Sequence, residues 1–308
     1  MDKLFCVLQT ALPVFLALGL GMLCRSTNFL SRSDIDGLKK VVLNITLPAV
    51  LLGAFSTTEY SVSTAVLPVS MFLLCCFALG LGFTLVKLFH SRSKLAPFIA
   101  SGFEAGMLGY ALFSLLFPDE SLSSFAILDL GQTLFVFTLY KILLYGQKNF
   151  KAILRDMIKT PILWAVAVGV VLGATGLYGK LGQVQAVFTG ITDFISAPTA
   201  MIILLTVGYD LVPREIPWKK VAGLLALRIF VMAVCLGLLL ALNRWVLNGM
   251  IFTGAAVLMC ILPPPYVIPV FADEPSERVQ ISSSLSALTF LTVIFFAVYA
   301  IIQGVQIP

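Results

Sequence analysis

Residues 101–110 read SGFEAGMLGY and place three glycines and one carboxylate inside the apolar run Ala96–Phe117. Glycine is a poor helix former, so a helix through this run is expected to weaken near its middle. A second apolar run, Gly249–Phe271, contains Pro263-Pro264-Pro265, which lacks three successive backbone N–H donors. The sequence therefore predicts two helices that break in the middle of apolar segments.

The composition surrounding these segments is that of a membrane protein. Of the 308 residues, 59% are hydrophobic and 11% are charged, whereas soluble proteins carry about a quarter charged residues. This excludes a water-soluble globule. Apolar runs extend from end to end and no polar segment could fold as a separate core, which predicts one membrane domain over residues 1–308.

The apolar runs predict an all-α polytopic fold with ten transmembrane helices. About 20 apolar residues are needed to cross a hydrocarbon core of roughly 30 Å. The predicted spans are Leu4–Cys24, Leu38–Phe55, Thr64–Phe89, Ala96–Phe117, Leu122–Tyr145, Pro161–Leu177, Val184–Leu211, Val221–Trp245, Gly249–Phe271 and Val279–Gln303.

The basic residues indicate the orientation of these spans. Loops after odd-numbered spans hold most of the Lys and Arg, among them Arg25, Arg92, Lys151 and Arg214. Because cytoplasmic loops carry this excess, both termini are expected outside a cytoplasmic (inner) cell membrane. The net charge of +5 thus reports topology and not nucleic-acid binding. The six cysteines show no metal-ligand spacing and are expected to be reduced packing residues.

The two halves of the chain align as an internal repeat. Pro13 aligns with Pro161 and Pro48 aligns with Pro198, so the offset between the halves hardly changes. The repeats are 1–146 and 159–308, joined by a basic cytoplasmic loop, 147–158. Five helices is an odd number, so the second repeat must enter the membrane with inverted topology. Such repeats are typical of secondary transporters.

The alignment also brings the two expected breaks to matched positions. Gly109 in the fourth span lies opposite Pro263 in the ninth span. In transporters with inverted repeats, the binding site forms near the midplane where broken helices of the two halves meet, and the freed amides and carbonyls can bind a ligand. Helix packing explains Gly109 alone equally well, and a simple kink is the alternative for the three prolines, but their matched positions in the repeat favour a site.

Ordered motifs along nearly the whole chain resemble the auxin efflux carrier family, which includes plant auxin exporters and bacterial permeases for malate, malonate and related organic acids. The motifs are Asn44 and Pro48, Gly106 and Gly109, Ala197-Pro198 and Gly208, Pro263-Pro264, and Ser282-Ser283-Ser284-Leu285. The resemblance implies a scaffold domain and a transport domain, helices four and nine crossing as broken helices, elevator-type alternating access and a homodimer. This chain differs from the family pattern in carrying Glu104 in place of an Asn and Ala111 in place of a Pro.

The predicted binding site lies around this crossing. Its substrate-binding residues are Asn44, Glu104, Ala105, Gly106, Gly109, Pro263, Pro264 and Tyr266, and its coupling or charge-partner residues are Glu104, Arg228 and Asp193. No metal ligand and no cofactor are expected.

The charged residues within the spans allow several interpretations. Glu104 could exchange a proton during transport, receive an amino group, or form a structural hydrogen bond. Arg228 could pair with Glu104, bind a substrate carboxylate, or extend to the membrane interface. Asp129 and Asp193 lie near predicted helix ends, where solvated or capping roles are expected. Alternatively, Asp193 lies beside the crossing together with Asn44.

The leading hypothesis is a secondary transporter that moves a small organic anion, a mono- or dicarboxylate, with proton or sodium coupling. The alternatives are a cation-coupled symporter similar to bile acid symporters, and a transporter-like receptor or channel. No catalytic set is recognisable, since the one histidine, His90, lies in a loop. The chain is therefore not expected to be an enzyme, and its expected partners are the substrate, membrane lipid and a second copy of itself.

Overall fold

A computed structural model describes residues 2–58, 60–61, 64–89, 93–144, 158–212, 214, 216–266, 268 and 275–306. These residues are helical or irregular and contain no strand. Of the predicted loop 147–158, all but Ile158 lies outside the described residues, as does the end of the predicted span Gly249–Phe271.

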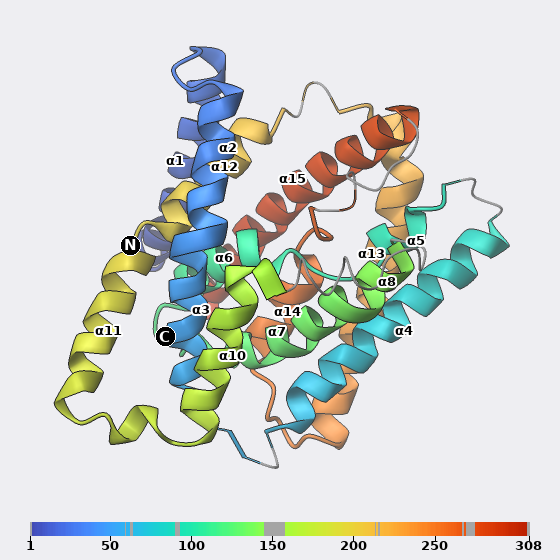
Figure 1. Cartoon of the computed structure of the whole chain (residues 1–308). Helices are drawn as coiled ribbons and strands as arrows, with labels where there is room; N and C mark the ends of the chain where they lie inside the picture. Colours follow the sequence, from blue (N-terminus) through green and yellow to red (C-terminus); the bar gives the residue numbers. More distant parts are fainter. Residues whose placement is uncertain are drawn as a thin grey trace.

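The helices of the structure, in chain order, fall close to the predicted spans (Figure 1). They are α1 (Asp2–Ser26); α2 (Arg32–Val41), η1 (Val42–Thr46) and α3 (Leu47–Ser56); α4 (Val66–Leu88); α5 (Ala96–Ile99), η2 (Ala105–Gly109) and α6 (Tyr110–Leu116); α7 (Ser123–Phe135), η3 (Val136–Tyr140) and α8 (Lys141–Leu144); α10 (Pro161–Ala174); η4 (Tyr178–Lys180); α11 (Gln183–Ser196) and α12 (Thr199–Asp210); α13 (Trp218–Trp245); α14 (Thr253–Ile261); and α15 (Pro275–Gln306).

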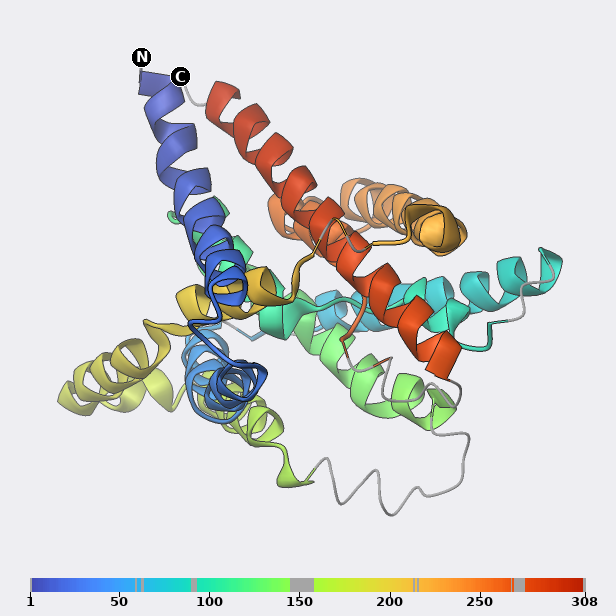
Figure 2. The ribbon, with the colours of Figure 1, turned by 90° about the horizontal axis from the view of Figure 1, so that it is seen from above.

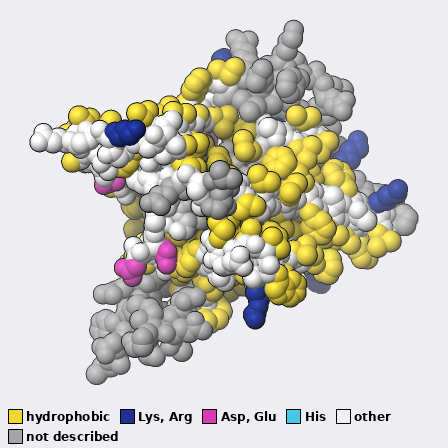
Figure 3. Space-filling view, turned by 90° about the horizontal axis from the view of Figure 1, so that it is seen from below, with side chains coloured by type: hydrophobic (Ala, Val, Ile, Leu, Met, Phe, Trp, Pro, Cys, Tyr) yellow, Lys and Arg dark blue, Asp and Glu magenta, His cyan; other side chains and the backbone are white. Residues whose placement is uncertain are grey.

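Six helices of the described chain are long and apolar enough to cross a membrane: Arg32–Ser56, Val66–Leu88, Ser123–Leu144, Gln183–Asp210, Trp218–Trp245 and Pro275–Ile302. Three shorter apolar helices accompany them, at Leu12–Ser26, Ala105–Leu116 and Pro161–Ala174. The outer surface is apolar over wide areas (Figure 3), and large side chains such as Leu73 and Phe194 are exposed on it. The chain is therefore a helical multi-pass membrane protein, while the ten-helix inverted repeat stays a prediction.

Two helices break, as the glycine and proline patterns predict. After α5 the chain leaves the helix at Ala100 and re-enters it at Ala105. After α14 it turns into extended backbone at Leu262, ahead of the three prolines. Gly102 has a positive φ of 68°, and a Cβ on it would lie 3.1 Å from Cγ of Pro265. Residues 100–104 and 262–266 therefore contact each other, and we call this pair of segments the crossing.

The helices form two groups on either side of the crossing (Figures 1 and 2). In one group, α1 packs along α12 and α3 packs along α10. In the other, α4 packs along α7, and α13 packs against α14 and α15. Close approach depends on glycine at several contacts: a Cβ on Gly208 would overlap the backbone of Leu18, and one on Gly131 would overlap that of Pro68. The candidate site lies in the space between the two groups.

Candidate functional site

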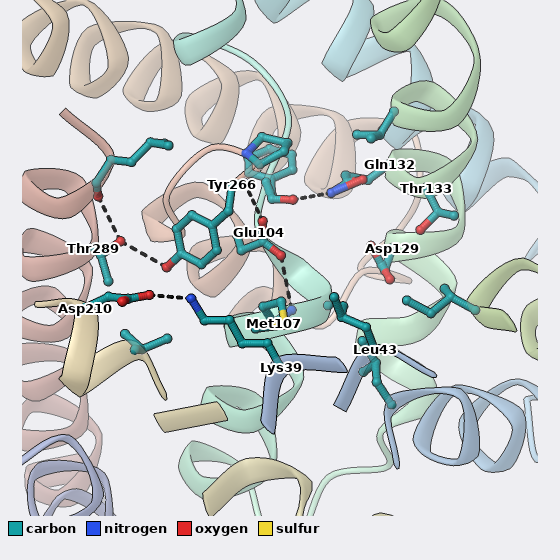
Figure 4. A pocket seen from close by; sticks show the side chains of 18 of the residues that line it. Lys39, Leu43, Glu104, Met107, Asp129, Gln132, Thr133, Asp210, Tyr266 and Thr289 are labelled. Carbon is teal, nitrogen blue, oxygen red and sulfur yellow. Dashed lines mark hydrogen bonds and ion pairs between the residues drawn. The ribbon is translucent and has the colours of Figure 1, made fainter. Parts of the chain in front are cut away.

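A cavity of about 740 Å³ lies between the two groups and reaches the crossing (Figure 4). It extends from the end of α1 and the start of α2 toward the middle of the molecule. Its ionisable residues include four basic side chains, Arg25, Arg32, Lys39 and Lys141, and three acidic ones, Glu104, Asp129 and Asp210. We call it the first cavity.

Glu104 joins the two broken helices. Its Oε1 accepts a hydrogen bond from the backbone N–H of Met107 (3.2 Å), which caps the helix that starts at Ala105. Its Oε2 accepts the backbone N–H of Tyr266 (2.7 Å), just after the three prolines. Its own N–H donates to the carbonyl of Pro263 (2.8 Å). The carboxylate therefore takes up amides of both broken segments that a ligand anion could otherwise bind.

Asp129 on α7 is a second carboxylate of the first cavity, and its side chain is only 4% exposed. Its Oδ2 accepts a hydrogen bond from the hydroxyl of Tyr110 on α6 (2.9 Å). One turn further along the helix, Gln132 donates to the backbone carbonyl of Phe103 in the crossing. The predicted solvated or capping role for Asp129 is wrong, because this carboxylate is buried at the inner end of the cavity.

Polar groups of other helices complete the first cavity. Asp210, at the end of α12, binds Arg32 and Lys39 of α2. The hydroxyls of Tyr266 and Thr289 share a hydrogen bond of 3.0 Å, which links the crossing to α15. Basic groups, of which Arg32 and Lys39 are paired with Asp210, thus lie around the outer part of the cavity, and Glu104 and Asp129 lie at its inner part.

Arg228 lies at the two helix breaks and does not line the first cavity. It therefore meets neither role predicted for its charge, which were pairing with Glu104 and binding a substrate carboxylate. It is 2% exposed, and it donates to the carbonyls of Ile99 (3.2 Å) and Leu262 (2.9 Å), where α5 and α14 end. Its guanidinium carbon lies 5.4 Å from the centre of the Phe103 ring. The expected extension to the membrane interface is wrong, and the side chain instead satisfies carbonyls that the two helix breaks leave free.

Of the other predicted site residues, some line the first cavity and others are buried in the packing around it. Gly106 and Tyr266 line the first cavity, and Pro265 lines it where Pro263 and Pro264 were predicted. Ala105 and Gly109 are buried, and a Cβ on Gly109 would lie 2.8 Å from Leu262 and Phe125.

The structure places Asn44 away from the first cavity. Its side chain is exposed and donates to the carbonyl of Lys40 in its own helix (2.8 Å). Leu43 and Leu47 of the same helix line the cavity in its place. The amide of Asn44 therefore makes a local contact within its own helix.

A second cavity, of about 370 Å³, lies at the opposite ends of several of the same helices. Its lining residues include Thr57 after α3, Tyr110 and Ser114 on α6, and Thr192 and Asp193 on α11. Asp193 therefore faces this second cavity, at a distance along the fold from Glu104 and the crossing.

Comparison with known proteins supports a transporter. No protein-family model matches the chain. Over 231 residues, 71% of the chain, it is 26% identical to an uncharacterized transporter of the archaeon Methanocaldococcus jannaschii, of which the match covers 73%. Together with the apolar helices, this similarity indicates a multi-pass membrane protein that acts in transport. Membership of the auxin efflux carrier family stays a prediction.

Proposed function

We propose that this protein is a secondary transporter that works by alternating access, with its substrate site in the first cavity beside Glu104. The observation that supports this most directly is the pair of cavities at opposite ends of shared helices. On α3, Leu51 lines the first cavity and Val50 lines the second. Met107 likewise lines the first cavity, and Tyr110, one helical turn later, lines the second. A thin layer therefore separates the two cavities, as alternating access requires.

The substrate class we propose is a small organic acid carried together with a proton. The basic side chains around the outer part of the first cavity would attract anions by long-range electrostatics. At the inner part, a substrate carboxylate would meet Glu104, and two like charges at low dielectric repel each other unless one is neutralised. A proton shared between Glu104 and the substrate carboxylate removes the repulsion. Transport of the anion would then depend on protons.

A second candidate is a substrate with an amino group. It is favoured by Glu104 and Asp129, which both line the inner part of the first cavity and could pair with an ammonium group. A zwitterion could in addition place its carboxylate near Lys39 or Lys141. This candidate and the first one differ in which compounds move and in the sign of the charge that moves with them.

The remaining architecture is part of the same proposal. Ten transmembrane helices in two inverted repeats would place both termini outside the cytoplasmic membrane, with the first cavity open to the basic, cytoplasmic side. The resemblance to auxin efflux carriers supports an elevator-type movement of one helix group against the other, and a homodimer. No enzymatic activity is part of the proposal.

The test is uptake of labelled mono- and dicarboxylates and of amino compounds into proteoliposomes, with and without an imposed pH gradient. Saturable carboxylate uptake driven by an inward proton gradient is the expected result. Movement of amino compounds alone would favour the second candidate. If no compound showed saturable uptake or counterflow, and a large unitary conductance appeared instead, the chain would be a channel and the proposal would be wrong.

A further inference from the structure

The layer between the two cavities contains a buried hydrogen-bonded pair of titratable side chains, Tyr110 and Asp129. We propose that this pair is a proton relay that connects the second cavity with the first. The inference rests on the proposed function, since it assigns the route by which the coupling proton enters the substrate site.

The geometry places each partner at a different cavity. Asp129 lines the first cavity and Tyr110 lines the second, and the two meet through the bond of 2.9 Å between the Tyr110 hydroxyl and Asp129 Oδ2. Both are almost fully buried, at 3% and 4% exposure. The pair is therefore a continuous polar contact across a layer that is otherwise built from apolar side chains such as Leu51 and Val50.

Other charged or titratable groups among the described residues lie at or near the cavities on either side of the pair. On the side of the first cavity they are Lys141 of α8, Lys39 and Arg32 of α2, Arg25 of α1, Asp210 of α12, Tyr266, and Glu104 of the crossing, which interacts electrostatically with Asp129. On the side of the second cavity they are Tyr60 in the loop after α3, Tyr178 of η4 and Asp193 of α11. Thr133, one turn after Asp129, also lies beside its carboxylate.

The relay step needs only proton movements. A hydronium ion that reaches the second cavity from bulk solvent gives a proton to the oxygen of Tyr110 and becomes water, while the original hydroxyl proton of Tyr110 moves to Oδ2 of Asp129. One O–H bond forms as another breaks at Tyr110, so the phenol stays neutral and Asp129 becomes a carboxylic acid. Asp129 then releases the proton into the first cavity, where Glu104 and the substrate carboxylate can share it.

The contact also explains why a tyrosine and not a phenylalanine is present here. The Tyr110 ring packs edge-on against Phe125, with 5.0 Å between ring centres. That packing needs only the ring, and the hydroxyl adds a link to Asp129. Removing the hydroxyl should therefore stop proton movement through the pair while leaving the packing of the layer intact.

The experiment compares Tyr110→Phe with Tyr140→Phe in proteoliposomes. Tyr140 is a matched control, because its hydroxyl is also buried and also makes one hydrogen bond of 2.9 Å, to the carbonyl of Phe98, but it lines neither cavity. Two rates are measured for each protein: substrate counterflow at equal pH, and uptake driven by a pH gradient, with a trapped pH-sensitive dye reporting the proton flux.

Tyr110→Phe is expected to keep counterflow within about twofold and to lose gradient-driven uptake and proton flux by about tenfold or more, as loss of a proton-transfer group does. Asp129→Asn is expected to lose gradient-driven uptake and proton flux to the same extent, and Tyr140→Phe is expected to keep both rates. Wild-type proton-driven uptake in Tyr110→Phe would overturn the relay. So would loss of counterflow in Tyr110→Phe, which would assign its hydroxyl to binding or folding. An unmodified protein without counterflow would instead refute the proposed function.

Discussion

A single carboxylate, Glu104, satisfies backbone donors on both sides of the crossing. A carboxylate that accepts backbone N–H bonds makes charge-assisted hydrogen bonds, which are stronger than neutral ones. By bonding Met107 and Tyr266 at once, Glu104 holds together two segments that lie 162 positions apart in the sequence. The same carboxylate also faces the first cavity, so binding of a substrate there and the strength of this tether are physically linked.

Replacing Glu104 with Gln tests this link. Gln keeps the length of the side chain, but its one oxygen cannot supply both acceptors in the present geometry. We expect a loss of about 1.5–3 kcal/mol in the free energy of unfolding, measured as a lower midpoint of thermal unfolding in detergent. We also expect counterflow of a carboxylate to become independent of pH, because the amide of the variant cannot share a titrating proton with the substrate.

The control for this substitution is Glu120→Gln, which makes the same chemical change at an exposed position. It should alter neither stability nor the pH dependence of counterflow. If Glu104→Gln retains the pH dependence of the unmodified protein, Glu104 is not the group that carries or shares the proton.

Arg228 performs the complementary task for carbonyl groups. We expect Arg228→Lys to lower the free energy of unfolding by about 1.5–3 kcal/mol, since an ammonium group cannot reproduce the two separated donors that reach Ile99 and Leu262. Circular dichroism melts of the purified protein would measure this. Arg244→Lys, at an exposed position near the end of α13, is the matched control. Equal melting of both variants would contradict the structural role of Arg228.

At the scale of single residues, the sequence indicated Glu104 correctly as a group at the helix break but could not indicate Asp129. The signal for Glu104 was local: a carboxylate among glycines in an apolar run. The relay role proposed for Asp129 depends on α6, which brings Tyr110 beside it in a tertiary contact. Asn44 was predicted at the site but does not line the first cavity. Which face of the helix it occupies depends on how the helix is rotated about its axis, and hydropathy does not determine that rotation.

Glycine contacts hold the elements of the two helix groups together. On α1 and α12, Gly21 and Gly208 let the two backbones approach so closely that a Cβ on either would overlap the partner helix. Small residues have this role in many membrane helix pairs, because dispersion forces replace the hydrophobic effect as the source of attraction. The α1–α12 contact is therefore expected to respond to a single added methyl group.

We predict that Gly208→Ala lowers the free energy of unfolding by about 1–3 kcal/mol, as overpacking does. Gly19→Ala is the matched control, since Gly19 lies on α1 with no atom within 4 Å of a Cβ placed there. Thermal unfolding in detergent and in lipid nanodiscs would compare the two. A Gly208→Ala protein as stable as Gly19→Ala would show that α1 and α12 do not pack as described.

Which helices form, and where two of them break, follows from local composition, so the apolar runs and the Gly and Pro patterns predicted these features well. The π-helical turns η1, η2 and η3 were not predicted, because each is a one-residue adjustment that depends on packing and not on the hydrophobic pattern. The shortness of the helical part of the ninth span, α14, had a visible cause in Pro263-Pro264-Pro265.

At the scale of the whole molecule, two cavities reach a shared layer from opposite ends. We therefore predict that each cavity is accessible from a different side of the membrane. Ser286 on α15 lines the first cavity, and Ser114 on α6 lines the second. In a protein whose six native cysteines are replaced, Ser286→Cys should react with a membrane-impermeant thiol reagent only from the side of Arg25, and Ser114→Cys only from the other side. Mass spectrometry after one-sided labelling of oriented vesicles measures this.

The controls are Ser26→Cys and Ser121→Cys, at exposed positions next to the ends of α1 and α6, which should label from one side each whatever the state of the cavities. Saturating substrate should lower labelling at Ser286→Cys, where it would fill the first cavity, and leave both controls unchanged. Because the layer between the cavities excludes the reagent, labelling of Ser286→Cys and Ser114→Cys from the same side would mean that they share one pathway. A channel-like path would then replace alternating access as the explanation for the two cavities.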